Sequence, residues 1–421
     1  MLKVINKILM YLLPIIAYYY AIIHISSNTI ILLATYISII MVILYTIIDY
    51  IRIIIFKKTN LFSEGVYKFF SVIINIAFFY SIFEYSMYAG LLIIWIILSI
   101  LLHEAGHFYF AIKNWVAISK FSVWFWQPIL EFNYKWIKWR FSNLLFGWYV
   151  EFKDEEVLKD IKWKKHFGEI KQIIKDKWLK VNQLYIFKKL NQKLPILFWW
   201  VFMNLLIAYF SLIWFFIYEV NQNTIIHKQG YHHQLTKQQK QYIIKQEKEQ
   251  KKDKDLMNYL KQRVWKTIWL WTKKINNKDE IWLSAWVEVF KWIELTYYSL
   301  IYAVNHPEYF TKFQSVVWVW KTVAKQDKVG FMNWGILLLI ISIINISLFV
   351  INLLPIPAVD WWQVVKEIIT HSLILWKKKP QWYTSYIKIA LSWFINILEY
   401  SWFWIITIYG LFLVYKDIFI N

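Results

Sequence analysis

Three residues within five positions have the types and the spacing that bind a catalytic metal: His103, Glu104 and His107. On a helix, positions i and i+4 share a face, so both imidazoles can bind one zinc ion. Glu104 would then flank the bound water and can take its proton. The pattern H-E-x-x-H therefore predicts a zinc site with a neighbouring general base.

A catalytic zinc typically has a third protein ligand and leaves one position open for water. The strongest candidate is Asp360, which ends the stretch Ile351-Asn-Leu-Leu-Pro-Ile-Pro-Ala-Val-Asp360. The two prolines are expected to interrupt a helix, which is tolerated at membrane depth where backbone lines a cavity. An ordinary surface position is the alternative interpretation of this carboxylate. The chain has no cysteine, which excludes thiolate ligands, thiolate nucleophiles and disulfides.

The element that must position the two histidines is the apolar run Tyr88–Ile112, which is long enough to cross a bilayer. His103 lies ten residues before Lys113, about 15 Å along a helix with a rise of 1.5 Å per residue. Ionisable side chains at that depth are costly and normally functional. A chance motif, or polar residues that only pack helices, is therefore the weaker interpretation.

The composition indicates a membrane protein, because hydrophobic residues make up 59% and charged residues only 18% of the chain. Seven apolar runs predict an all-α polytopic membrane protein with about seven transmembrane helices. They are Ile8–Ile23, Ile30–Ile48, Phe69–Phe83, Tyr88–Ile112, Leu194–Tyr218, Trp334–Leu354 and a stretch within Ile387–Tyr415. No cleavable signal peptide is evident, because the first run lacks a small-residue cleavage site.

Lysine and arginine predict the orientation. With a cytoplasmic N-terminus, the basic loops before the first span, between the second and third, after the fourth and before the last all face the cytoplasm. The net charge of +21 follows this topology without a recognisable binding module, so no nucleic-acid partner is expected. The segment from Asn221 to Asn333 would be external, and within it Gln234–Arg263 is expected to be a solvated stretch.

These motifs resemble the site-2 protease family of intramembrane zinc metalloproteases, in particular the bacterial type that acts in regulated intramembrane proteolysis. In that family the H-E-x-x-H helix is paired with a later N-x-x-P-x-P-x-L-D-G motif, to which Asn352–Asp360 is similar. Lys120–Pro128 and Leu145–Phe152 resemble the small membrane-associated β-hairpin region that follows the H-E-x-x-H helix. Phe198–Ala208 resembles the family's next helix.

The resemblance covers roughly Tyr88 to Tyr415 and implies four parts. They are an N-terminal module of three transmembrane helices (1–86), the first half of a protease core (87–220), a polar external insertion (221–332) and the C-terminal half of the core (333–421). Family members often carry a PDZ domain in the external segment. Here that segment shows little alternating strand pattern, so a complete PDZ domain is not expected.

The resemblance implies a zinc-dependent endopeptidase that cuts within or near transmembrane segments. His103, His107 and Asp360 would hold Zn²⁺, and Glu104 would be the general base. The remaining candidates are two amides that would bind the substrate backbone or the oxyanion, or else only pack helices: Asn204 and Asn352.

The expected partners are membrane-protein substrates with a transmembrane segment and the lipid bilayer. The expected location is the bacterial inner (plasma) membrane, and the oligomeric state stays open. A catalytically inactive pseudoprotease scaffold or an ion-binding transporter is the alternative. A pseudoprotease usually lacks a ligand or the base, whereas all four residues are present here. A transporter would show internal repeats with paired broken helices, and only one such break is found.

Tryptophan occurs 28 times and glycine 9 times, whereas an average chain of this length has roughly thirty glycines. Tryptophan also occupies five positions at which the resembled family has glycine: Trp124, Trp126, Trp148, Trp361 and Trp362. It is a poor substitute for a residue chosen because it has no side chain. One hypothesis is that these residues are glycines encoded by UGA. The alternative is genuine tryptophan in an aromatic-rich interfacial protein.

Overall fold

The computed structural model describes residues 2–56, 64–153, 175, 179–185, 188–229, 281–312, 315–354, 356–357, 360–375 and 381–419. The chain forms two compact units, Met1–Lys189 and Leu190–Asn421. The predicted boundaries at residues 86, 220 and 332 divide the chain differently and stay predictions. The predicted solvated stretch Gln234–Arg263 lies outside the described residues.

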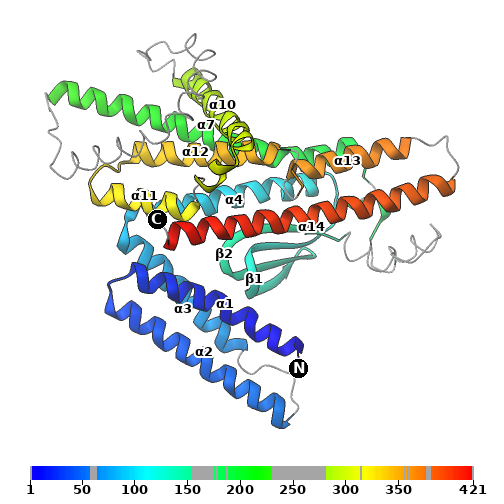
Figure 1. The fold of residues 1–421 in the computed structure, drawn as a ribbon, viewed down its shortest axis with the longest axis horizontal. Helices are drawn as coiled ribbons and strands as arrows, with labels where there is room; N and C mark the ends of the chain where they lie inside the picture. The colour runs from blue at the N-terminus through cyan, green and yellow to red at the C-terminus, as the bar shows by residue number, and fades with distance from the viewer. Residues whose placement is uncertain are drawn as a thin grey trace. The chain divides into compact units, whose positions relative to one another are not determined.

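The first unit begins with four helices (Figure 1): α1 (Leu2–Ile25), α2 (Thr29–Phe56), α3 (Glu64–Tyr85) and α4 (Met87–Lys113). Helix α3 packs against α1, α2 and α4. Polar contacts between these apolar helices are side-chain hydrogen bonds, such as the one of 2.7 Å between Thr46 on α2 and the buried Tyr67 on α3. Two polar groups that satisfy each other in this way avoid the cost of burial without a partner.

Two long bent strands follow α4 and complete the first unit: β1 (Ile118–Tyr134) and β2 (Ile137–Phe152). They pair antiparallel from Tyr134 opposite Ile137 outward, and residues 120–123 of β1 have two sets of partners, 148–151 and 138–141 of β2. The two strands thus make a small sheet of four short segments. This confirms the predicted β-hairpin region after the H-E-x-x-H helix.

The sheet lies against α4. Phe121 and Val123 are buried, and they pack with apolar side chains of α4 that include Ile97, Leu101 and Phe108. The phenyl ring of Phe108 contacts that of Phe121 edge-on, with ring centroids 5.1 Å apart. These contacts place the hairpin against the helix that carries the histidines.

The second unit is built of helices, which are α7 (Leu190–Gln229), α10 (Ile281–Asn305), α11 (Val316–Lys328), α12 (Trp334–Leu353), α13 (Asp360–Leu375) and α14 (Gln381–Phe419). Helices α7, α10 and α12 pack against one another around a core that includes Ala208, Leu212, Ala285 and Ile346. Small residues such as Ala208 let the helices approach closely, and the Ser342 hydroxyl of α12 donates to the Ala208 carbonyl at 3.0 Å.

Six helices among the described residues are long and apolar enough to cross a membrane. Each of these six contains or overlaps one predicted span, and the first predicted span lies within α1, of which Ile15–Ile25 is a shorter apolar helix. The predicted mainly helical, polytopic architecture is confirmed. Helix α10 was not predicted as an element, because its charged residues Glu288, Lys291 and Glu294 interrupt the apolar run.

Candidate metal centre

Helix α4 holds the three metal-binding candidates in one helical turn. Its first turn is capped by Ser86, whose side chain accepts a hydrogen bond from the Ala89 amide, as an N-cap residue does. The helix then runs without a break to Lys113. A continuous helix is what places His103 and His107 on the same face, as the spacing predicts.

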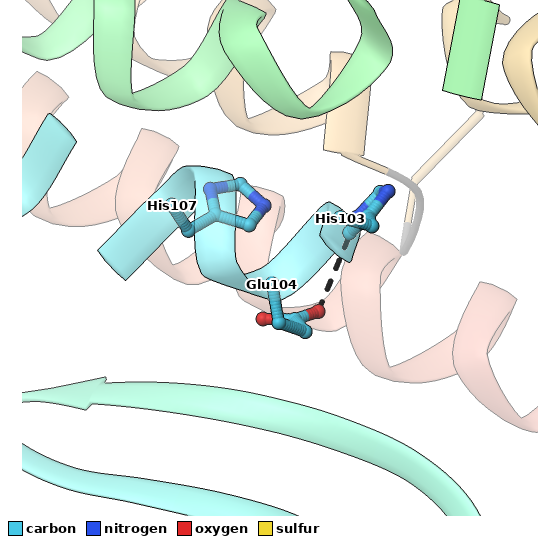
Figure 2. Close-up of side chains that lie close together, drawn as sticks. All are labelled: His103, Glu104 and His107. Carbon is cyan, nitrogen blue, oxygen red and sulfur yellow. Dashed lines mark ion pairs between the residues drawn. The ribbon is translucent and has the colours of Figure 1, made fainter. Parts of the chain in front are cut away.

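The structure brings His103, Glu104 and His107 together (Figure 2). One ligand atom from each of the three side chains lies within 4.8 Å of the others. The two imidazole rings are edge-on to each other with centroids 5.4 Å apart. The Nε2 atom of His103 lies 4.0 Å from the Oε1 atom of Glu104, whose side chain is 17% exposed.

The surroundings of this cluster are apolar and shielded. His103 is 9% exposed, and the neighbouring residue Gly106 is also buried. The sheet packs against the same helix through Phe108, one residue beyond His107. Imidazole and carboxylate groups in such an environment are expensive to bury unless they are paired or bind a metal.

The donor set fits a zinc ion. Two imidazole nitrogens and a carboxylate within one turn are the ligand types that zinc takes in proteins, and imidazole suits zinc better than calcium or magnesium. Because two histidines supply only two ligands, the cluster on α4 needs a further protein ligand to reach the three that a catalytic zinc site typically has.

The candidate for that ligand, Asp360, is the first residue of α13 in the second unit. Helix α12 ends at Leu353, its cap residue Leu354 is extended, and Pro357 lies in a turn. The predicted interruption of the helix before Asp360 is thus confirmed. The side chain of Asp360 lies outside the described residues, so its role as a ligand stays a prediction.

The two candidate amides also lie in the second unit. Asn204 is 2% exposed on α7, and Asn352 is half-buried in the last turn of α12. The structure shows a further buried amide that was not predicted from the sequence, Asn345 of α12. This side chain is 1% exposed, and its amide nitrogen donates to the Ile341 carbonyl at 2.9 Å. An asparagine in the middle of an apolar span is the signal that could have found it.

A second missed residue is Asn75 of α3. Its amide nitrogen donates to the Ser71 carbonyl at 2.7 Å and to the Asn143 carbonyl of β2 at 3.3 Å. The side-chain oxygen of Asn143 in turn accepts a hydrogen bond from the Gln127 amide at 3.2 Å. Through these bonds α3 is tied to the hairpin that packs on the histidine helix.

The chain matches a known protein family. The family model for peptidase family M50 matches residues 91–395, nearly three quarters of the chain. The matched range includes the cluster on α4 and Asp360, and it begins after α3. No curated protein matches the chain.

Proposed function

Because this chain belongs to peptidase family M50, the site-2 protease family, and is a multi-pass integral membrane protein, we propose that it is a zinc-dependent intramembrane endopeptidase. Its substrates would be membrane proteins, cut within or near a transmembrane segment in regulated intramembrane proteolysis. The observation that carries the proposal is the cluster of His103, Glu104 and His107 inside an apolar helix long enough to span a bilayer.

His103, His107 and Asp360 would hold the metal. When bound, zinc would lower the pKa of a water molecule and polarise the scissile carbonyl. Glu104 would take the proton from the attacking water and pass it to the leaving amide nitrogen, which is general acid–base catalysis. Its position beside His103 and its partial burial support this role, because a shielded carboxylate interacts more strongly with a nearby proton donor than an exposed one.

The hairpin would bind the unwound substrate. Within the described residues, segment 130–134 pairs with β2 along one side only, which leaves an edge that an extended peptide can join. Three apolar side chains of this segment are exposed: Leu130, Phe132 and Tyr134. An apolar edge suits a segment that comes out of a membrane. Asn204 and Asn352 would donate hydrogen bonds to substrate backbone or to the developing oxyanion.

We place the protein in the bacterial inner membrane with its N-terminus in the cytoplasm. The support is the distribution of lysine and arginine, which favours this orientation by the positive-inside rule. The alternative, an inactive pseudoprotease scaffold or an ion-binding transporter, differs from this proposal in the absence of cleavage. The presence of all three proposed ligands and of the proposed base weighs against the pseudoprotease.

The metal content of the purified protein tests the proposed ligands. We expect about one zinc per chain in the wild type, and loss of zinc in His107→Ala and in Asp360→Ala. The matched control is His24→Ala, because His24 also lies on an apolar helix and bonds only to the Tyr20 carbonyl of its own helix among the bonds described. Full zinc in Asp360→Ala would refute the assignment of the third ligand, and equal loss in the control would show that the assay reports misfolding.

A further inference from the structure

Three non-glycine residues among those described have a positive φ angle: Trp115 (57°), Lys135 (48°) and Trp136 (66°). This left-handed region brings the Cβ atom of an L-residue too close to backbone atoms, so glycine is its usual occupant. Asparagine and aspartate enter it far more readily than residues with bulky side chains. Two of the three positions nevertheless hold the bulkiest side chain of all.

Trp115 occupies the position after the cap of α4. The Val116 amide donates to the Ala111 carbonyl at 2.8 Å, and the Trp115 amide donates to the Ile112 carbonyl at 2.9 Å. This pair of hydrogen bonds is the Schellman motif, whose left-handed residue is most often glycine. The Trp115 indole is 77% exposed, so its packing does not explain the conformation.

Trp136 is the second residue of the two-residue turn between β1 and β2. Tyr134 pairs with Ile137 across the turn, and both residues between them have a positive φ. A two-residue turn of this kind is type I′, for which Asn-Gly and Asp-Gly are the preferred sequences. Trp136 is 90% exposed, so here too the side chain contributes little packing while the backbone has the conformation of a glycine.

The candidate metal loop adds an observation of another kind. Trp361 and Trp362 follow Asp360 directly, and the indole Nε1 of Trp362 is buried and has no hydrogen-bond partner among the described residues. A buried donor without a partner destabilises a fold. The ring of Trp361 lies against that of Phe198, with centroids 5.4 Å apart. Glycine at position 362 would remove this donor, and glycine at position 361 would remove the ring that lies against Phe198.

We propose that residues 115 and 136 are glycine in the protein made by its own cells, because UGA codons are read there as glycine. We propose glycine for the same reason at residues 124, 126, 148, 361 and 362. The backbone angles are independent of any family motif, and they favour glycine at two positions that the motifs do not include. The abundance of tryptophan and the shortage of glycine in the chain have the same cause.

Other tryptophans are expected to be genuine. Trp139 has ring contacts in the core of the first unit, with centroids 5.0 Å from Phe121 and 5.6 Å from Phe108. Glycine at position 139 would remove these contacts and leave a cavity beside α4. Position 139 is therefore expected to differ from positions 115 and 136, where the side chain is exposed and the backbone is left-handed.

Peptide mass spectrometry of the protein isolated from its own cells tests the proposal. Cleavage after lysine gives Asn114–Lys120, and cleavage after glutamate gives Phe132–Glu151, which holds positions 136, 139 and 148. Each glycine in place of tryptophan makes a peptide about 129 Da lighter, because the side chain is missing. We expect glycine at 115, 136 and 148 and tryptophan at 139. Tryptophan at 115 or at 136 would overturn the proposal.

A second measurement uses the chain produced with tryptophan at every position of the sequence as given. Trp136→Gly removes both the indole and the Cβ atom, whereas the matched control Trp136→Ala removes the indole alone. If the left-handed backbone needs glycine, the thermal midpoint rises in Trp136→Gly and not in Trp136→Ala. An equal rise in both variants would mean that the exposed indole is at fault, which would contradict the conformational argument.

Discussion

The approach of α3 to α4, the helix that carries the proposed metal site, depends on Gly90. This residue is buried in the first turn of α4, and a Cβ atom added there would lie 2.7–2.8 Å from three ring atoms of Phe83 on α3. Carbon atoms in ordinary contact are about 3.5–4.0 Å apart. Gly90→Ala therefore forces the ring or the helix to move, and overpacking of this kind costs about 1–3 kcal/mol.

The matched control is Gly65→Ala, in the first turn of α3, where an added Cβ atom meets nothing within 4 Å. Both variants gain the helix propensity of alanine, about 1 kcal/mol. This gain cancels when the two are compared. We expect Gly90→Ala to be less stable than Gly65→Ala by about 1–3 kcal/mol in the free energy of unfolding.

Thermal unfolding in one fixed detergent, followed by loss of helical circular dichroism, would measure the difference. In the double variant Phe83→Ala/Gly90→Ala the new methyl group has room, so its loss of stability should be smaller than the sum of the losses of the two single variants. Equal stability of Gly90→Ala and Gly65→Ala would refute the close packing of α3 on α4. So would a double variant whose loss is the sum of the two single losses, since residues in contact are not additive.

Two further predictions concern the hairpin. Asn75→Ala removes the hydrogen bond to the Asn143 carbonyl. We therefore expect amide hydrogen exchange of β2 around Asn143 to speed up and the free energy of unfolding to fall by about 1–3 kcal/mol. Unchanged exchange would contradict the proposed link between α3 and the hairpin. Partial burial raises the pKa of Glu131, but hydrogen bonds from Lys138 and Arg140 outweigh it and hold the pKa below its usual value. Because the pKa of Glu131 is lower in the folded protein than in the unfolded one, the ionised carboxylate stabilises the folded hairpin above the unfolded pKa, and this stabilisation is lost as the pH falls. Protection of the hairpin tip from amide exchange should therefore decline below about pH 4, by less than about 1 kcal/mol. Glu131→Gln should abolish that decline.

The control for the first of these is Ser81→Ala. Ser81 is buried on the same helix as Asn75, and it donates to the Ala77 carbonyl of that helix. The hydrogen bond that this variant removes lies within α3. Faster exchange of β2 in both variants would mean that any disturbance of α3 reaches the sheet, and the specific role of Asn75 would then be wrong.

The parts of the fold that depend on local pattern could be predicted from the sequence. The span predicted as Trp334–Leu354 is helix α12, Trp334–Leu353, because an apolar run ended by a proline segment leaves little choice of boundary. The cluster on α4 was equally predictable, since two histidines four positions apart share a helix face whatever surrounds them. The left-handed turn at Trp136 was not predicted, because tryptophan gives no turn signal there.

The parts that depend on tertiary packing could not be predicted. The contact of Asn75 with Asn143 joins residues far apart in the sequence, and neither lies in a motif. Helix α10 carries charged residues, among them Glu288 and Lys291, which form an ion pair of 3.0 Å, so its sequence does not resemble a membrane span. Its apolar residues are recognisable as a packed face only in the structure, where they contact α7 and α12. The role of Asp360 likewise depends on the packing of distant segments.

Cleavage of a test substrate with one transmembrane segment, reconstituted with the protein in lipid vesicles, addresses the central claim most directly. We expect the wild type to cut within or near that segment, and Glu104→Gln to retain zinc while its rate falls by about 10²–10⁴-fold, the usual contribution of a general base. Glu64→Gln, which breaks a half-exposed ion pair with Lys68 in the first turns of α3, should cut at the wild-type rate. Undiminished cleavage by Glu104→Gln would contradict the account.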